Sequence, residues 1–224
     1  MSDDDNPLVH LESEGDRVEV ASGAVLVRRW LSLDAQRGIV ERYREWCAGP
    51  VPARSPVVRG HEMSVTTLCV GWHWRPYQYS RDAPDVNGQR VLEFPSWLGD
   101  LGRRALTATG TAWGIENYEP DVALVNYYDD EAKMGMHQDK DERSDAPVVS
   151  LSIGDSCRFR FGNCERRTRP YRDVELASGD LFVFGGSARF AYHGVVRVHP
   201  GTAPAECGLD AGRLNLTMRA TGLT

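Results

Sequence analysis

Residues 213–219 read RLNLTMR, and polar and apolar side chains alternate along this stretch without a break. Because successive side chains of a β-strand point to opposite faces, the alternation predicts a strand with one wholly apolar face, which should be buried. That face consists of Leu214, Leu216 and Met218. The opposite face carries Arg213, Asn215, Thr217 and Arg219. Where these four polar side chains lie decides what the fold can do.

The two arginines of this strand need negative partners if their face points into a barrel, because a buried cation without a partner is costly. A planar guanidinium suits a carboxylate, which it binds through two parallel hydrogen bonds. A dicarboxylate held by Arg213, Arg219 and Asn215, with one end on a metal ion, would satisfy the whole face. The alternative is an exposed edge strand whose arginines are solvated.

Several other short segments after residue 120 alternate in the same way. They cover residues 122–128, 134–139, 148–153, 158–161, 181–184 and 190–196. Within 122–128, Asn126 and Tyr128 share one face and supply further hydrogen-bond donors. Gly154-Asp155-Ser156 is a hairpin signal between two of the segments. This series of short strands and turns predicts an antiparallel barrel or jelly roll.

The first half of the chain has a different pattern. Apolar residues at helical spacing predict a helix over 33–47, ended by Gly49-Pro50, and a second helix from Ser96 to a stop at Gly110. These helices would cover one face of the strand block. Residues 24–30 indicate a strand, and residues 63–80 are rich in β-branched and aromatic side chains, which favours strands or an extended flap.

Three possible metal ligands lie on the predicted strands. His137 and Asp139 are two residues apart, so both side chains point to one face. His193 follows in the aromatic setting FAYHG. Two histidines and one carboxylate leave coordination positions open and are the ligand set of non-haem Fe(II) oxygenases. Taken alone, an HxD pair is weak evidence for a metal site, and His193 is more simply interpreted as a core histidine. The arginines of 213–219 are what favour a metal site at these three residues.

The length of 224 residues, with 41% hydrophobic and 26% charged residues, fits one globular domain. The first 20 residues hold seven acidic side chains and one arginine, so they account for the formal charge of −6. We expect residues 1–20 to form a flexible acidic tail and residues 21–224 to form a single domain. Five cysteines without a CxxC pair, an acidic start and the lack of a long apolar run predict a cytoplasmic protein that enters no membrane.

Five segments resemble the AlkB family of Fe(II)/2-oxoglutarate-dependent dioxygenases. Four carry the core motifs: NYYDDEAKMGMHQDKDE (126–142), VSLSIGDSCRFRFG (149–162), LFVFGGSARFAYHGV (181–195) and RLNLTMRATG (213–222). The fifth, MSVTTLCVGWHWRPYQYS (63–80), is similar to the substrate flap of the family. The match runs in order from near residue 24 to the end, and HxD, the distant histidine and RxNxTxR together are highly specific.

The resemblance implies an α+β, mainly β fold. Residues 119–224 would form a double-stranded β-helix (jelly roll), and residues 21–118 would supply the helices on one face and the flap. Iron would be held by His137, Asp139 and His193. The co-substrate 2-oxoglutarate would be held by Asn126, Tyr128, Arg213, Asn215 and Arg219.

The resemblance also implies an activity. In the family, Fe(II), O2 and 2-oxoglutarate oxidise an N-methyl group of a nucleobase, and succinate, CO2 and formaldehyde are released. The expected function is therefore direct-reversal repair of N-alkylated DNA, or of RNA, by a monomer, and a duplex base must be flipped to reach the iron. By similarity the substrate would be bound by Trp72, Tyr77, Tyr79, Asp141 and Arg166.

The chain departs from the family at three places. Tyr127 stands where a basic residue is common, and Asn163 stands where a second glycine follows Gly162. The flap is two residues shorter before Tyr77, so Trp72 and Trp74 compete for the stacking position. We favour Trp72 because it follows Gly71 in the family's Val-Gly-Trp context.

The basic segment 158–172 bears on the class of substrate. It holds six arginines and a single acid, Glu165. It is either a solvated hairpin edge or a surface that contacts backbone phosphates. With the aromatic flap it favours nucleic acid over the alternative of a hydroxylase or demethylase for a small molecule or protein. A third possibility, a catalytically silent binding module, is disfavoured by the intact ligand set.

Overall fold

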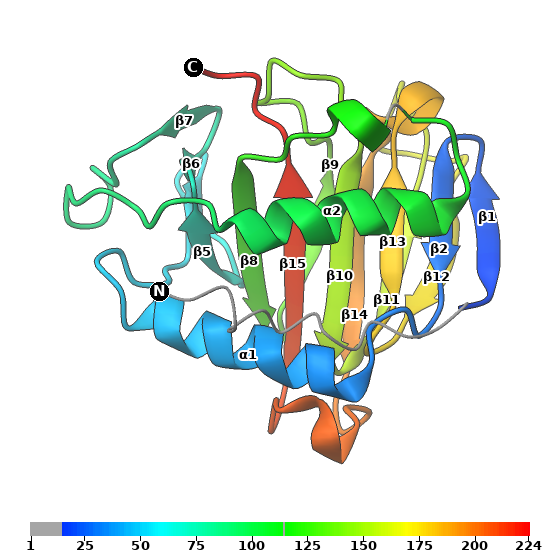
Figure 1. The fold of residues 1–224 in the computed structure, drawn as a ribbon, viewed down its shortest axis with the longest axis horizontal. Coiled ribbons are helices and arrows are strands. Elements are labelled where there is room, and N and C mark those ends of the chain that lie inside the picture. Colours follow the sequence, from blue (N-terminus) through cyan, green and yellow to red (C-terminus); the bar gives the residue numbers. More distant parts are fainter. Residues whose placement is uncertain (1–14, 114) are drawn as a thin grey trace.

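The computed structural model describes residues 15–113 and 115–224, in which two antiparallel sheets enclose a core (Figure 1). The major sheet has the order β1-β2-β13-β10-β15-β8-β5, and the minor sheet has the order β12-β11-β14-β9. The major strands are β1 (Arg17–Ala21), β2 (Ala24–Val27), β5 (Thr66–Val70), β8 (Val122–Tyr128), β10 (Val148–Gly154), β13 (Leu181–Phe184) and β15 (Arg213–Arg219). The minor strands are β9 (Met134–His137), β11 (Ser156–Phe161), β12 (Arg172–Leu176) and β14 (His193–His199). This pair of sheets is the jelly roll that the strand pattern predicts.

Strand β15 has the bounds that its alternation predicts, and it lies inside the major sheet between β10 and β8. The interpretation of this strand as an exposed edge is therefore wrong. The side chains of Leu214, Leu216 and Met218 are fully buried beneath the helices. The polar side chains of β15 point to the other face, into a cavity between the two sheets.

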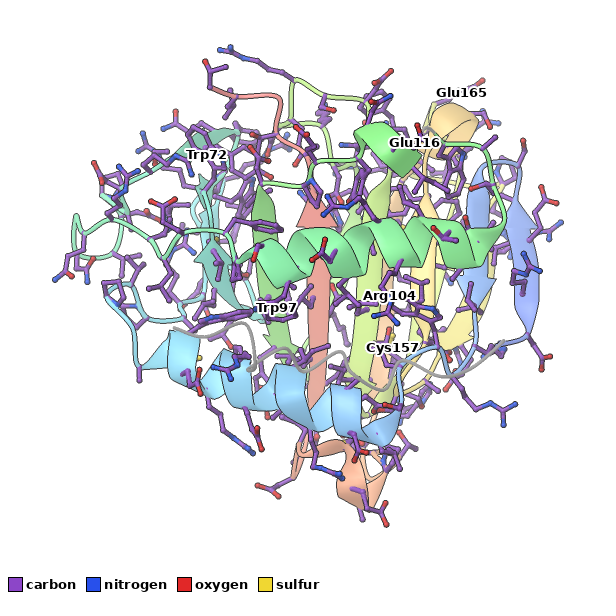
Figure 2. All side chains as sticks on the ribbon, in the orientation of Figure 1. Trp72, Trp97, Arg104, Glu116, Cys157 and Glu165 are labelled. Carbon is purple, nitrogen blue, oxygen red and sulfur yellow. The ribbon has the colours of Figure 1, made fainter. Side chains whose placement is uncertain are left out.

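Helices α1 (Leu33–Cys47) and α2 (Ser96–Thr109) lie across the outer face of the major sheet (Figure 1). Both helices end where the sequence predicts. The hydroxyl of Ser32 accepts the amide of Ala35 and caps α1, and Gly110 ends α2 in the left-handed conformation at φ 66°. Trp97, labelled in Figure 2, stacks on Trp46 with 6.1 Å between ring centroids and joins the two helices.

The minor sheet closes the core with aromatic side chains. Phe159 and Phe161 of β11 pack edge-on against Phe182 of β13, at 5.1 and 5.2 Å between ring centroids. The turn from β10 to β11 is fixed by Asp155, whose buried carboxylate accepts the backbone amides of Thr202, Ala203 and Gly212. The turn at 154–156 is thus tied to the start of β15. The hairpin predicted there is wrong, because β10 pairs within the major sheet and β11 pairs within the minor sheet.

The flap projects from the end of the major sheet where β5 lies (Figure 1). It contains the hairpins β3 (Val57–Val58) with β4 (His61–Glu62), and β6 (His73–Arg75) with β7 (Gln78–Ser80). Between β5 and β6 the chain turns at Gly71, whose φ of 88° favours glycine. A β-carbon at Gly71 would lie 2.0 Å from the carbonyl oxygen of Asp121, so the turn also needs a residue without a side chain.

The structure corrects the predicted tail. Residues 1–14 lie outside the described residues, but residues 17–21 form β1, which pairs with β2. The boundary at residue 20 is therefore wrong, because an alternating Arg-Val-Glu-Val stretch extends the sheet despite its charge. Strand β12 is a second element that the sequence pattern missed. Among the helices of the described part of the chain, none is both long and apolar enough to cross a membrane.

Candidate active site

His137, Asp139 and His193 converge at the end of the minor sheet, as the sequence predicts. His137 is directly opposite His193 in the pairing of β9 with β14. The Nε2 atoms of His137 and His193 lie 3.5 and 3.6 Å from the two carboxylate oxygens of Asp139. One ligand atom from each residue falls within 4.8 Å of the others, which is a suitable arrangement for one metal ion.

Each histidine is oriented by its other ring nitrogen. The Nδ1 of His137 lies 2.9 Å from the carbonyl of Gly135, and the Nδ1 of His193 lies 3.0 Å from the carbonyl of Ala191. Because a carbonyl only accepts, Nδ1 carries the proton and Nε2 is free to bind a metal. Burial, with repulsion from His137, lowers the pKa of His193 to about 4, so this ring is neutral at pH 7.

Asp139 is buried and remains ionised because of its neighbours. Burial opposes ionisation, but the positive charge of Arg219 is the largest effect that counters it, and the pKa of the Asp139 carboxyl is lowered. A guanidinium nitrogen of Arg219 lies 2.8 Å from Asp139 Oδ2. A second nitrogen of Arg219 lies 2.9 Å from Glu142 Oε1. Arg219 is therefore shared between two buried carboxylates.

Arg213 has no such partner. Its side chain is 1% exposed and donates to the hydroxyl of Ser152 and the carbonyl of Asp155. Among the described residues, no carboxylate forms an ion pair with it, and its Nε has no hydrogen-bond partner. The Nε of Arg219 is also unpaired, and both arginines line the same cavity. A buried cation with unused donors fits an anionic ligand, so the residues present suit a dicarboxylate.

The other polar residues predicted here also line this cavity, which has a volume of 390 Å³. The phenol of Tyr128 is buried, and Asn126 accepts a hydrogen bond from Thr67. Asn215 donates to Ser150 and Leu151 and accepts from Thr217, so its amide is already bonded within the protein. The volume lies within the range of small-molecule sites.

The two flap tryptophans lie in different surroundings. Trp72 lies at the base of the flap (Figure 2), where it is 7% exposed and donates its indole N–H to Asp121 at 2.9 Å. Trp74 lines the cavity, and Trp72 does not. Trp72 thus lies apart from the cavity, because it belongs to the turn at Gly71 and precedes β6, which begins at His73. That Trp72 stacks on a base stays a prediction, and the cavity favours Trp74.

Of the two flap tyrosines, one lines the cavity. Tyr77 is 61% exposed at the cavity rim, at the tip of the β6–β7 turn. Tyr79 is not among the lining residues, and its hydroxyl donates to Glu142 at 2.5 Å. The hydroxyl of Tyr79 is thus already bonded to a buried carboxylate, and its contact with substrate stays a prediction.

Asp141 lines the cavity as predicted, and its carboxylate accepts the indole N–H of Trp74 at 2.9 Å. Arg166 does not line the cavity, since its side chain turns back to the carbonyl of Arg169. The adjacent Arg167 does, with its guanidinium 5.8 Å from the ring centroid of Tyr192. The cavity thus favours Arg167 over the predicted Arg166, because a loop without period cannot be placed from its neighbours.

Two supporting residues were missed. Gln138, between two metal ligands, donates to the carbonyls of Cys164 and Phe190 and joins the arginine loop to the metal strand. Arg189 is fully buried and bonds Glu142 and the carbonyl of Asp139. A polar residue between two ligands is a signal that could have identified Gln138. Nothing in the local sequence distinguishes Arg189 from a surface arginine.

Comparison with known proteins places this site in a family. Residues 23–219 match the model of the 2OG-Fe(II) oxygenase superfamily. The protein AlkB of Escherichia coli, an alpha-ketoglutarate-dependent dioxygenase, is 36% identical over 210 residues, which are 91% of this chain and 92% of that protein. A solved structure of OsALKBH1 matches 92% of this chain with a TM-score of 0.82 and 32% identity, over 100% of its own length.

A plant relative is longer. The DNA N(6)-methyladenine demethylase ALKBH1D of Arabidopsis thaliana is 32% identical over 236 residues, which are 93% of this chain and 53% of the plant protein. The chain thus spans about half the length of the plant relatives it matches and most of the length of the bacterial ones.

The metal site can be tested without a substrate. His137→Ala removes one of three ligands, and we expect the affinity for Fe(II) to fall about a hundredfold or more, since even outer-sphere partners of metal ligands are worth about 10–100-fold. Anaerobic calorimetric titration with Fe(II) measures this. His199→Ala removes a histidine of the same strand β14 outside the site and should bind Fe(II) normally. Equal affinity in the two variants would contradict the assignment.

Proposed function

Since this chain belongs to the AlkB family of 2OG-Fe(II) oxygenases, we propose that it oxidatively removes alkyl groups from the bases of DNA, with RNA as a second possible substrate. The observation that carries the proposal is the composition of the cavity. Its floor holds the three metal ligands and the two arginines with unused donors. Its rim combines aromatic rings with cations, a combination suited to a base and its flanking phosphates.

At the floor, His137, Asp139 and His193 would hold Fe(II). When bound, the iron with 2-oxoglutarate supplies oxidation of a C–H bond by O2, with succinate and CO2 as products. Arg219 lies beside Asp139 and would bind the carboxylate nearer the metal, whereas Arg213 would bind the far carboxylate. Tyr128 and Asn126 would contact the same ligand, and Asn215 would support it through its bonds to Ser150 and Leu151.

At the rim, three cations line the mouth on both sides. Arg59 lies on the flap, Lys140 follows the metal ligand Asp139, and Arg167 lies in the β11–β12 loop. Other arginines of the basic segment have protein partners, since Arg160 pairs with Asp173 and Arg172 donates to Val20. We therefore expect Arg167 to contact phosphate.

Between floor and rim, Trp74 would stack on a flipped base. Asp141, two residues after the metal ligand, uses one oxygen to hold the Trp74 indole. Its other oxygen has no partner among the described residues and could accept an exocyclic N–H of the base. These contacts orient the alkyl group toward the metal ligands. The five cysteines, all free, agree with a cytoplasmic location. We also propose that the protein acts as a monomer.

The function is tested by product release. Single-stranded DNA and RNA oligonucleotides with one N-methylated adenine or cytosine are incubated with the protein, Fe(II) and O2, with and without 2-oxoglutarate. We expect formaldehyde only when both the methyl group and 2-oxoglutarate are present, with an equal amount of succinate above the background that forms without oligonucleotide. Succinate without formaldehyde from every oligonucleotide would instead support the small-molecule or protein hydroxylase.

The two flap tryptophans should separate affinity from stability. Trp74→Ala removes the stacking platform and should weaken oligonucleotide binding about ten- to a hundredfold. Trp72→Phe loses the hydrogen bond to Asp121 and should lower the free energy of unfolding by about 1 kcal/mol while binding is retained. Fluorescence anisotropy and urea unfolding measure the two quantities. If Trp72→Phe alone weakened binding, the assignment of the platform to Trp74 would be wrong.

Tyr77 offers a test in which stability and binding change in opposite directions. It occupies the second position of a two-residue turn with φ 73°, a conformation that costs a non-glycine residue about 1–2 kcal/mol. Tyr77→Gly should leave stability unchanged or raise it by up to about 1 kcal/mol, after the larger unfolded-state entropy of glycine is subtracted. It should nevertheless weaken oligonucleotide binding, because the exposed ring is lost from the rim.

Tyr77→Phe is the matched control, since it keeps both the ring and the strained turn and removes only the bond from Arg59. We expect it to bind like the unaltered protein. A loss of stability in Tyr77→Gly with unchanged binding would show that the ring serves packing and not recognition.

A further inference from the structure

Three segments of the chain meet at β6 on the side away from the cavity. Strand β6 points Trp74 toward the cavity, and the preceding His73 points the opposite way and is 1% exposed. Asp85, in the loop between β7 and α2, lies with its Oδ1 2.6 Å from the Nε2 of His73. Arg54, which precedes β3, completes the group. We call these three residues, Arg54, His73 and Asp85, the flap clamp.

Arg54 connects the clamp to the main chain of Trp74. Its Nε and Nη2 lie 3.0 and 2.9 Å from Asp85 Oδ2. The same Nη2 donates to the carbonyl oxygen of Trp74 at 2.6 Å. One guanidinium thus joins the Asp85 carboxylate to the backbone that carries the aromatic wall of the cavity.

The histidine of the clamp depends on Asp85. Burial lowers the pKa of His73 despite the hydrogen bond to Asp85, so the ring is neutral at pH 7 and donates its Nε2–H to the carboxylate. Its Nδ1 has no partner among the described residues. Without the Asp85 carboxylate the Nε2–H of His73 would lose its acceptor and would face only the Arg54 guanidinium, whose Nη2 lies 3.2 Å away and is itself a donor.

The loop that carries Asp85 is held in place by its own contacts. The amides of Val86, Asn87 and Gly88 all donate to the carbonyl of Ala83. The side chain of Asn87 donates to the carbonyl of Pro50, and Ala83 is buried in a small apolar cluster. Asp85 is therefore a fixed anchor, although its side chain is 33% exposed.

Trp74 is consequently fixed at two ends. Asp141, on the metal side of the cavity, holds its indole, and the flap clamp holds its carbonyl. We propose that Asp85 is a positioning residue, which acts through Arg54 and His73 to align Trp74 and thereby sets the affinity for the flipped base but not the rate of oxidation. This inference rests on the proposed function and extends it to a residue that touches neither the base nor the metal site.

The test compares Asp85→Asn with Asp82→Asn. Asp82 lies in the same loop, is exposed, and has no hydrogen bond to its carboxylate among the described residues. For Asp85→Asn we expect the KM for a methylated oligonucleotide to rise about three- to tenfold, a part of the full stacking contribution, with kcat unchanged. Succinate formed without oligonucleotide should also be unchanged. Asp82→Asn should match the unaltered protein in all three quantities.

A second measurement needs no catalysis. The indole N–H resonance of Trp74 is identified by its loss in Trp74→Phe, and we expect it to shift or broaden in Asp85→Asn but not in Asp82→Asn. Arg54→Lys keeps the charge but cannot span both the carboxylate and the carbonyl, so it should reproduce both effects. It also serves as the test if Asp85→Asn does not fold.

Different outcomes separate this inference from the function on which it rests. If the unaltered protein releases no formaldehyde from any oligonucleotide, the proposed function fails, whereas the resonance still reports on the clamp. An unchanged Trp74 resonance, an unchanged KM, or a fall in kcat alone in both Asp85→Asn and Arg54→Lys would overturn the positioning role.

Discussion

The guanidinium of Arg219 lies between two buried carboxylates, and the rest of the site depends on this balance of charge. As a ligand of the proposed metal ion, Asp139 must stay ionised in the interior, and burial alone would oppose this. Glu142 takes the second half of the guanidinium and is itself bonded by Arg189 and Tyr79. Removal of Arg219 would leave the buried Asp139 carboxylate without a cationic partner, which is far more costly than the net worth of an ion pair.

The same network joins elements that are distant in the sequence. Tyr79 belongs to the flap, Arg219 to the last strand, and Arg189 to the segment before β14. The flap is thus held to the metal site by a hydrogen bond to a buried carboxylate, and not only by apolar packing. Trp74 and Tyr79 are cross-strand partners in the β6–β7 hairpin, so the hydroxyl of Tyr79 reaches Glu142 beside Arg219.

The sequence predicts those helices and strands in which apolar residues recur at regular spacing and only one face of the element is buried. The alternation of 213–219 and the helical spacing of 33–47 both have this property, and their elements appear with the predicted bounds. His137 follows from the same period, but β9 ends at His137, so Asp139 lies beyond the strand that was predicted to carry it. Arg166 and Trp72 were assigned in a loop and beyond a glycine turn, where no period connects a residue to its neighbours.

Charge patterning was less informative than periodicity. An acidic segment at the start was expected to be a tail, yet its last part pairs with β2 as an edge strand, since backbone hydrogen bonding does not depend on net charge. Similarly, the arginines of 158–172 form one cluster in the sequence. In the structure they are separated, because they lie on β11, on its partner β12 and in the loop between them, and Arg160 forms an ion pair with Asp173.

Strand β9 is the edge of the minor sheet and has β14 as its one neighbour there. It nevertheless carries His137, and Asp139 follows it directly, whereas His193 opens the neighbouring strand. An ion held by all three would act as a cross-link over the weakest boundary of the sheet. Binding energy gained at that boundary is added to the cost of separating the strands, so metal availability and resistance to local unfolding are thermodynamically linked. A protein of this design would lose its ion and its sheet edge together.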